Sequence, residues 1–188
     1  MNSTADQDSR SRERELVQMA ISGNADAFGQ LYDQYVDKIY SYLYYRTHHR
    51  REAEDLCSRV FMKALNHIEN YEDRGYPFSA WLYRIAHNLV VNWYRDMEKK
   101  REIPLVDQYP PPAEDSQVES RMVEFDKNKR LMTILKQMPV DRQELIILKH
   151  VEGLSNKEIG QIMDRTEGAI KALYHRTLTA LREEYDLG

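Results

Sequence analysis

The chain has 188 residues, of which 41% are hydrophobic and 31% charged, so it can bury a core and is not generally disordered. No apolar run approaches the roughly 20 residues of a membrane span, and the first fifteen residues lack a signal-like apolar stretch, which predicts a cytoplasmic protein without membrane insertion. The single cysteine excludes an internal disulfide framework, and the net charge of −4 at first argues against a nucleic-acid partner.

In chain order, the first segment is residues 1–15, which are polar and expected to be disordered. Three apolar stripes with three- and four-residue steps then predict helices over 28–43, 53–68 and 78–93. No long segment alternates with a period of two, so residues 16–101 predict a helical bundle with a turn before the third helix.

Several side chains on these stripes are expected to belong to the core. Tyr32 and Tyr35 fit the apolar side of the first helix, and Cys57 lies on the second as a buried structural thiol. Trp81 and Trp93 fall on the third stripe, so both indole side chains are predicted to be buried.

A proline-rich segment follows the bundle. Four of the six prolines lie within 104–112, and residues 102–126 carry seven acids and one base, which predicts a flexible, acidic, proline-rich linker. Most of the negative charge therefore belongs to a segment that need not touch a polyanion. The fold class is all-α, with two small helical domains joined by this linker, the second spanning 127–188.

The second block carries clear helix boundaries. Asp141 followed by Glu144, and Ser155 followed by Glu158, each match a capping box at the start of a helix. Gly153 suits the left-handed residue that closes the helix starting near Asp141. A short helix from Ser155, a tight turn and a longer basic helix together predict a helix-turn-helix.

The longer helix is predicted to be capped by Thr166 and to bury Ile170, Tyr174, Leu178 and Leu181. Its opposite face would then enter a DNA major groove, with the preceding short helix against phosphate. The candidate duplex contacts are Ser155, Lys157, Thr166, Glu167, Lys171, His175 and Arg176. The alternative is a generic helical hairpin with a solvated charged face.

A second clue lies in residues 79–101, which hold five bases and two acids with tryptophan and tyrosine interleaved. Basic residues beside aromatic rings are what single-stranded nucleic acid needs, because phosphates are neutralised while unstacked bases find flat surfaces. Tyr71, Tyr76 and Tyr94 are expected to reach solvent.

These motifs match a known family. Ala53-Glu54-Asp55-Leu56, Phe61 and the segment 78–88 resemble region 2 of extracytoplasmic-function (ECF, group IV) sigma factors of the sigma-70 family. The residues that resemble region 4 are Pro139, Leu145, Leu148, Glu152-Gly153-Leu154-Ser155, Glu158-Ile159, Gly168, Ile170-Lys171 and Arg176. The similarity covers about 20–101 and 130–183, in the family's order and spacing.

The resemblance implies a bacterial transcription initiation factor, not an enzyme, without cofactor or metal. It would bind core RNA polymerase at the clamp helices of the largest subunit and the flap of the second-largest subunit. It would recognise promoter DNA as duplex at the −35 element and as a melted strand at the −10 element, and an anti-sigma factor would hold it inactive. Two tethered modules that each bind weakly imply that the free protein binds promoter DNA poorly.

Site residues follow from the same resemblance. The polymerase contacts would be Glu54, Asp55, Ser58 and Arg59. The −10 contacts would be Tyr71, Tyr76, Arg84, His87, Asn88, Asn92, Arg95 and Lys99. Ser58, Arg59 and Leu173 depart from the residues usual in the family, with Leu173 standing where a basic −35 contact is common.

Two other classes of function fit the sequence less well. A transcription regulator with a helical sensory domain would need an apolar pocket in place of the basic-aromatic helix. An all-helical enzyme would need a catalytic constellation, but His48 and His49 are adjacent and cannot share a helical face. The sequence has no metal-binding His-Glu-x-x-His, glycine-rich phosphate loop or nucleophile elbow.

Overall fold

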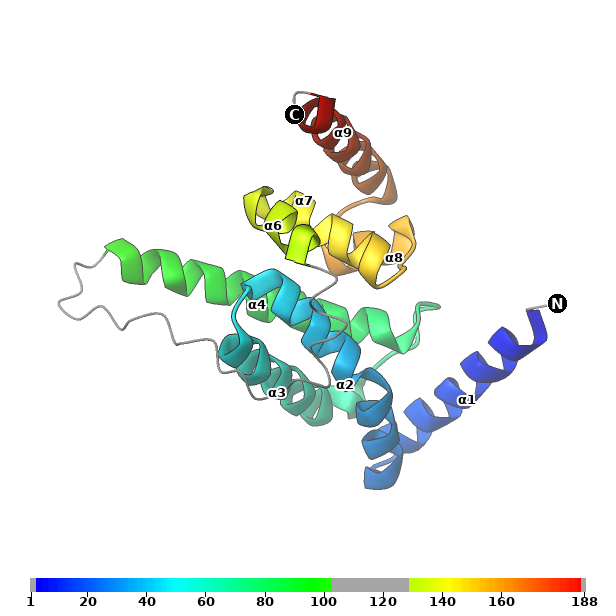
Figure 1. Cartoon of the computed structure of the whole chain (residues 1–188). Helices are drawn as coiled ribbons and strands as arrows, with labels where there is room; N and C mark the ends of the chain where they lie inside the picture. Colours follow the sequence, from blue (N-terminus) through cyan, green and yellow to red (C-terminus); the bar gives the residue numbers. More distant parts are fainter. Residues whose placement is uncertain (1–2, 103–128, 187–188) are drawn as a thin grey trace.

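The structure is a computed structural model that describes residues 3–102 and 129–186, and both parts are helical (Figure 1). The order of elements is α1 (Ser3–Ile21), α2 (Ala25–Thr47), α3 (Arg50–His67), the 3₁₀ turn η1 (Ile68–Asn70), α4 (Phe78–Glu102), α6 (Lys129–Gln137), α7 (Val140–Ile146), the π-helical turn η2 (Ile147–Val151), α8 (Asn156–Ile162) and α9 (Glu167–Asp186). No strand occurs in these two ranges, which confirms the all-α class. Apart from Glu102, the predicted linker lies outside the described residues.

Residues 3–102 form an N-terminal bundle in which α2, α3 and α4 pack together. Asn24 caps α2, since its Oδ1 accepts the N–H of Ala27 at 3.0 Å. Buried apolar side chains recur at the predicted helical spacing: Leu31, Ile39, Leu43, Leu56, Val60, Leu82 and Ala86. Cys57 is buried as predicted, and burial, with a smaller contribution from Asp37, raises the pKa of its thiol to about 11.

One core prediction in the bundle is wrong. Tyr35 is buried, but Tyr32 is 41% exposed and only its ring edge packs on Phe61, with centroids 4.7 Å apart. Leu31 and Tyr35, four residues apart, lie on the buried face of α2. Tyr32 follows Leu31 directly and is therefore rotated away from that face.

The N-terminus also differs from the prediction, because residues from Ser3 onward within 1–15 belong to helix α1. The Tyr35 hydroxyl donates to the Glu13 carboxylate, and Arg14 Nε lies 3.6 Å from Asp73 Oδ2. Val17 is buried against the bundle. Residues 3–15 are charged but favour helix formation. They extend the helix because the last turns of α1 pack on the apolar surface of the bundle.

Residues 129–186 form a C-terminal domain. The capping box of α8 is confirmed: Ser155 Oγ accepts the Glu158 N–H at 3.3 Å, and Glu158 Oε2 accepts the Ser155 N–H at 2.7 Å. Gly153 has φ +70°, as its predicted left-handed role requires. At Gly160 the backbone approach is close, because a Cβ there would lie 2.6 Å from the carbonyl oxygen of Arg165.

The second predicted capping box is wrong. Helix α7 follows Pro139 and has no side-chain cap, so Asp141 already lies inside its first turn. The Asp141 carboxylate pairs with Arg165 of the same domain, whereas Glu144 is 2% exposed and turned into the interior. The sequence spacing fits a cap, but the helix starts earlier than that spacing assumes.

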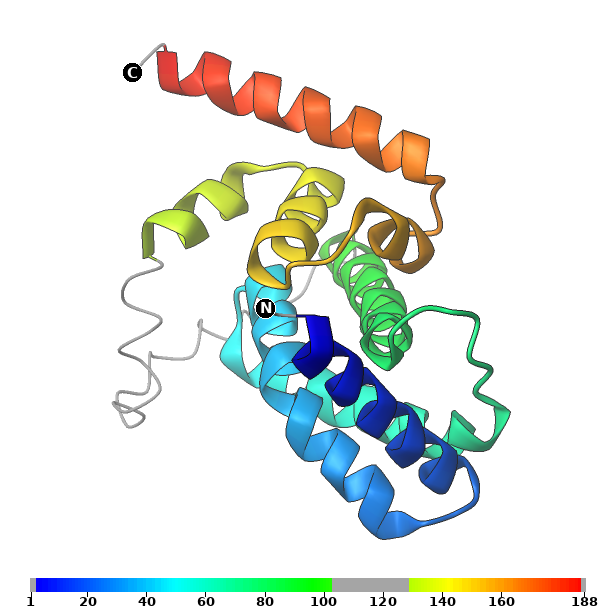
Figure 2. The same ribbon diagram turned by 90° about the vertical axis from the view of Figure 1, so that its right-hand side faces the viewer.

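The two parts pack against each other. Elements α7, η2 and α8 lie over α4 and the C-terminal half of α2, while α9 projects away from the bundle (Figures 1 and 2). Buried apolar residues of both parts belong to one continuous core cluster. Within the described ranges, no helix combines the length and apolarity that crossing a bilayer demands.

Candidate polymerase and nucleic-acid interfaces

The candidate polymerase contacts share the exposed side of α3, here called the α3 face: Glu54, Asp55, Ser58 and Arg59. Arg50 Nε lies 2.9 Å from Glu54 Oε1, and Arg59 Nη1 lies 3.7 Å from Asp55 Oδ2. Exposed pairs of this i,i+4 kind contribute about 0.3–0.5 kcal/mol each. An arginine from a partner could therefore displace Arg59 from Asp55 with little loss of free energy.

The loop over 71–77 precedes α4. The half-buried Tyr71 ring packs edge-on against Trp81, with centroids 5.1 Å apart, and burial together with Asp73 raises the pKa of Tyr71 to about 12. Asp73 Oδ1 accepts the N–H of Gly75 at 2.9 Å, and Gly75 has φ +79°. The loop is thus held by its own contacts, and only part of the Tyr71 ring reaches solvent.

Helix α4 presents an exposed polar stripe: Arg84, Asn88, Asn92, Arg95 and Lys99. Within it, Arg95 Nη2 donates to Asn92 Oδ1 at 2.8 Å. Tyr94 departs from the expectation, because its hydroxyl donates to the carbonyl of Arg46 and burial raises its pKa. The structure therefore brings Arg84, Asn88, Asn92, Arg95 and Lys99 to one exposed side of α4. His87, also predicted to contact the −10 strand, is half-buried against Glu144, and Tyr94 is turned toward the bundle.

The C-terminal domain reaches this stripe at its start. Arg84 Nη2 lies 4.0 Å from Asp164 Oδ1 in the turn between α8 and α9. Lys157 Nζ of α8 lies 5.1 Å from the ring centroid of Tyr76. Two residues predicted to meet the −10 strand, Tyr76 and Arg84, thus lie beside the helix-turn-helix in this structure.

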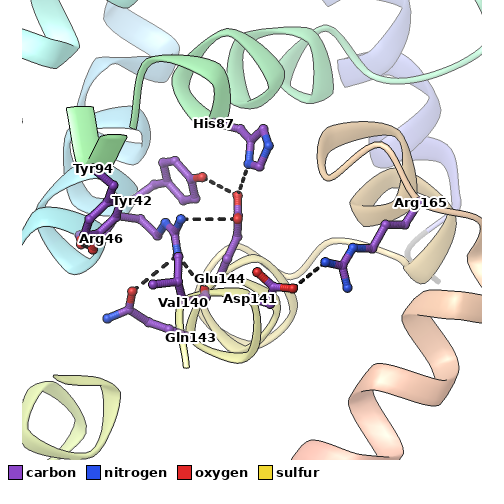
Figure 3. Close-up of polar contacts among 9 residues, drawn as sticks. All are labelled: Tyr42, Arg46, His87, Tyr94, Val140, Asp141, Gln143, Glu144 and Arg165. Carbon is purple, nitrogen blue, oxygen red and sulfur yellow. Dashed lines mark hydrogen bonds and ion pairs between the residues drawn. The ribbon is translucent and has the colours of Figure 1, made fainter. Parts of the chain in front are cut away.

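A buried polar cluster joins the two parts beside these contacts (Figure 3). Its centre is Glu144 of α7, whose Oε1 accepts the Tyr42 hydroxyl at 2.6 Å and lies 2.7 Å from His87 Nδ1. Arg46 Nη2 lies 3.3 Å from Glu144 Oε2, and Arg46 Nη1 donates to Gln143 Oε1 at 3.3 Å. Arg46 is 0% exposed, so this ion pair is screened from water.

Electrostatics keep the cluster ionised. Burial alone would raise the pKa of Glu144, but the charge of Arg46 and the hydrogen bonds of His87 and Tyr42 outweigh it and hold that pKa below 4.5. Burial would lower the pKa of Arg46, and the charge of Glu144 reverses that shift. Burial next to Glu144 raises the pKa of Tyr42 well above its usual value, so Tyr42 remains a donor.

A second hydrogen bond crosses between the parts nearby. The Tyr83 hydroxyl of α4 donates to the Glu152 carboxylate, and burial raises the pKa of both groups. Tyr83 is 2% exposed, so its ring belongs to the bundle core while its hydroxyl reaches the other domain.

Sequence reasoning missed the residues at the centre of this cluster. Tyr42 and Arg46 were unassigned, and Glu144 was assigned to a helix cap. One signal was available, because Arg46 follows Leu43 on the apolar stripe of α2, where a buried guanidinium requires a carboxylate partner. That partner lies in another domain, so local spacing does not reveal it.

The helix-turn-helix of α8 and α9 has the predicted outward face. Its candidate duplex contacts are all exposed: Ser155, Lys157, Thr166, Glu167, Lys171, His175 and Arg176. Thr166 Oγ1 accepts the N–H of Ala169 at 3.2 Å, as a helix cap should. Lys171 Nζ lies 2.7 Å from Glu167 Oε1, and this hydrogen bond and charge lower the pKa of Glu167.

The buried side of α9 differs from the prediction. Leu178 is 40% exposed, while Leu173 and Thr177 are buried beside Ile170. Leu173 therefore belongs to the core and does not face outward. Helix α9, which packs on α7 and α8, therefore turns inward the face that carries Ile170, Leu173 and Thr177.

Comparison with known families identifies both parts. Residues 31–101 match the model of Sigma-70 region 2, and residues 128–181 match that of Sigma-70, region 4. The ECF RNA polymerase sigma factor BldN of Streptomyces coelicolor is 37% identical over 177 residues, covering 94% of this chain and 67% of BldN. The ECF RNA polymerase sigma factor SigW of Bacillus subtilis is 30% identical over 179 residues, covering 91% and 95% of the two chains.

Solved structures share the fold. CnrH, determined in complex with the cytosolic domain of CnrY, superposes with a TM-score of 0.70 at 21% identity and covers 94% of this chain and 98% of its own. The sigma factor RpoE of Bartonella quintana, determined with the anti-sigma factor NepR, superposes with a TM-score of 0.60 at 24% identity, covering 83% and 94%.

The fold and the paired matches define a transcription initiation factor of the sigma-70 type. More narrowly, the chain belongs to the extracytoplasmic-function sigma factor family, which confirms the resemblance drawn from its motifs.

Proposed function

We propose that this chain binds core RNA polymerase through the α3 face and directs initiation at promoters that it recognises at two elements. On this proposal, α4 and the loop before it hold the melted −10 strand, and α9 reads the −35 element as duplex. The polymerase clamp helices and flap are the proposed docking surfaces.

The observation that carries the proposal is the separation of three chemically different surfaces. The α3 face is acidic at Glu54 and Asp55, which suits a basic partner. The α4 stripe combines arginine and asparagine with the aromatic loop before it, which suits a single strand. Outward lysine and arginine on α9 sit at the N-terminal half of a recognition helix, where base edges are read.

An anti-sigma partner is also proposed. The structural neighbours CnrH and RpoE were each solved with a second protein, which for RpoE is an anti-sigma factor. Because this chain has their fold and belongs to the same class of protein, we expect a comparable protein to hold it inactive.

The direct test is transcription in vitro with core RNA polymerase of the source bacterium and fragmented genomic DNA of that organism as template. Sequencing of RNA 5′ ends should show start sites that appear only when the chain is added, with shared sequences upstream. Transcripts that do not depend on the chain would contradict the proposal.

The α3 face is tested by Asp55→Arg, which places a positive charge opposite the basic partner that the proposal requires. We expect polymerase association, measured by fluorescence anisotropy of labelled chain, to weaken about tenfold or more, since like-charge contacts oppose binding strongly. Asp33→Arg makes the same charge change at an exposed site on α2 and should bind normally. Equal affinity of the two variants would remove polymerase binding from the α3 face.

A further inference from the structure

The loop over 71–77, proposed to hold the −10 strand, is contacted by the N-terminal helix. Helix α1 packs on η1, the 3₁₀ turn that leads into this loop. Arg14 of α1 places its Nε 3.6 Å from Oδ2 of Asp73, in the middle of the loop. The sequence predicts disorder for residues 1–15, so neither the helix nor this contact follows from the sequence alone.

The two oxygens of Asp73 have different partners. Oδ1 accepts the N–H of Gly75 at 2.9 Å and so closes the turn at the tip of the loop, where Gly75 has φ +79°. Oδ2 faces Arg14 of α1. Because the carboxylate is one rigid group, its pairing with Arg14 also orients the oxygen that closes the turn. Arg14 thus acts on the shape of the loop through Asp73.

Helix α1 is itself fixed to the bundle. Val17 and Ala20 are buried in the core. The Glu13 carboxylate accepts the hydroxyl of Tyr35. Glu13, Val17 and Ala20 follow one another at steps of four and three residues, so they share the side of α1 that faces the bundle. Arg14 comes directly after Glu13 and is turned about 100° from it, which brings its guanidinium to the loop.

Tyr35 also connects α1 to the ends of the loop. Its ring centroid lies 5.9 Å from that of Phe78, the first residue of α4. The Phe78 ring lies in turn 5.4 Å from that of Tyr71, the first residue of the loop. This aromatic cluster holds the two ends of the loop, and the contact between Arg14 and Asp73 holds its tip.

The charges of the loop show why a cation is useful beside it. Arg74 Nη2 lies 2.8 Å from Glu72 Oε2, so that acid is neutralised within the loop, whereas Asp73 is neutralised by Arg14. The side chains of Arg14 and Asp73 are 72% and 38% exposed. Such a surface pair contributes little to the stability of the fold. Its effect therefore falls on the geometry of the loop.

We propose that helix α1 holds the loop over 71–77 in the conformation that recognises the −10 strand, with Arg14 as a positioning residue that acts through Asp73. This role rests on the function proposed above for the loop. Helix α1 lies outside the surfaces proposed to contact polymerase and DNA, yet it would set how sharply the chain discriminates among −10 sequences.

The contact itself is tested in the full chain without polymerase. Arg14→Gln removes the charge but keeps a polar side chain. Exchange of the Gly75 amide hydrogen with solvent, measured by nuclear magnetic resonance, should become about two- to threefold faster, the size expected for the loss of an exposed ion pair. Unchanged exchange would overturn the proposal.

Arg12→Gln is the matched control. It removes the same charge from an exposed site on α1 that lies nearly opposite Arg14, since two residues span about 200° of a helix. The exchange of Gly75 should stay as in the unmodified chain. Equal acceleration by the two variants would mean that the charge of α1 matters but its contact with Asp73 does not, which would also overturn the proposal.

The role in recognition is tested by transcription with core RNA polymerase, at a start site that the unmodified chain uses, from templates with a randomised −10 element. Asp73→Asn keeps an oxygen that can accept the Gly75 N–H but loses the charge that Arg14 meets. Arg14→Gln and Asp73→Asn should each reduce the preference for the best −10 sequences about two- to threefold. The double variant should be no worse than either, because both changes break one contact.

A direct contact of Arg14 with a phosphate would give another result. Arg14→Gln would then lower initiation equally on all −10 sequences, and Asp73→Asn would raise it by removing a repulsive charge. That pattern, or faster Gly75 exchange with an unchanged −10 preference, would overturn the positioning role. If the unmodified chain directs no transcripts, the proposed function fails instead, and the exchange measurement still decides whether α1 holds the loop.

Discussion

The two helices expected to face DNA lie in different surroundings. Helix α9 runs along the outer edge of the molecule with Lys171, His175 and Arg176 exposed (Figure 2). Helix α4 passes beneath the C-terminal domain and uses Tyr83 and His87 to hold it. The proposed −35 surface is therefore exposed, whereas α4 is covered by the C-terminal domain near its start and exposed further along, at Asn88, Asn92, Arg95 and Lys99.

The interactions of the two helices differ in kind as well. On α9, the ion pair of Glu167 and Lys171 is exposed and lies within one helix turn. Its small energy is therefore nearly independent of the rest of the structure. On α4, His87 contributes to a buried cluster whose members come from α2, α4 and α7. A change in that cluster should alter the whole chain, while a change on α9 should alter DNA contact alone.

The largest effect is expected from Arg46→Met, which keeps much of the side-chain volume but leaves Glu144 buried without a cation. The free energy of unfolding, measured by urea denaturation, should fall by about 3–5 kcal/mol, the range for breaking a buried pair. Arg59→Met breaks the exposed pair with Asp55 and should change it by about 0.5 kcal/mol or less. Similar losses for the two variants would mean that the buried cluster contributes no more than a surface pair.

A smaller effect concerns pH and the contact of His48 with the C-terminal domain. The amide nitrogen of Gln143 lies 2.7 Å from His48 Nε2, and its amide oxygen faces Arg46, so this amide donates to a neutral imidazole. Burial, with the charges of Lys136 and Arg46, lowers the pKa of His48 from 6.5 to about 4.

Because the folded pKa is the lower one, the contribution of His48 is fully present above pH 6.5 and is lost as pH falls toward 4. We expect the unfolding free energy to decrease across that window. His48→Asn should flatten the decrease, since asparagine tolerates the left-handed backbone at this position, where φ is 55°. Parallel pH curves for the two chains would exclude His48 as a source of the dependence.

The smallest effect separates the two helices directly. In the free chain, Arg176→Ala should weaken binding of a random-sequence DNA duplex a few-fold and reduce the slope of log K against log salt by about one. Arg84→Ala should have the smaller effect on both, because Arg84 lies 4.0 Å from Asp164, whose negative charge repels phosphate. Fluorescence anisotropy at several salt concentrations measures both quantities. Equal effects of the two substitutions would mean that Asp164 does not reduce the contribution of Arg84 to DNA binding.

Features determined by neighbouring residues were predictable from the sequence. The capping box at Ser155, the cap at Thr166 and the left-handed Gly153 depend on contacts within a few positions, and each is present. The apolar stripes likewise located the helices of the bundle, and the exposed candidate residues of α3 and α9 lie on the expected faces.

The relation between the domains was not predictable in this way. Glu144 bonds to Tyr42, which is 102 positions away, and to His87, which is 57 positions away. Its spacing from Asp141 imitates a helix cap, and only the fold shows that both carboxylates have other partners. Leu178 is exposed and Leu173 is buried, the reverse of the prediction, for a related reason: the face that α9 buries depends on the helices that pack against it.

Glycine at position 160 determines how the helices α8 and α9 are held relative to each other. Because α8 touches the backbone at Arg165 with no room for a Cβ, the angle between α8 and α9 is fixed by direct backbone contact. Helices α8 and α9 are therefore expected to move as one rigid body. On the proposed function, the distance between the two promoter contacts would be set by where polymerase holds that body.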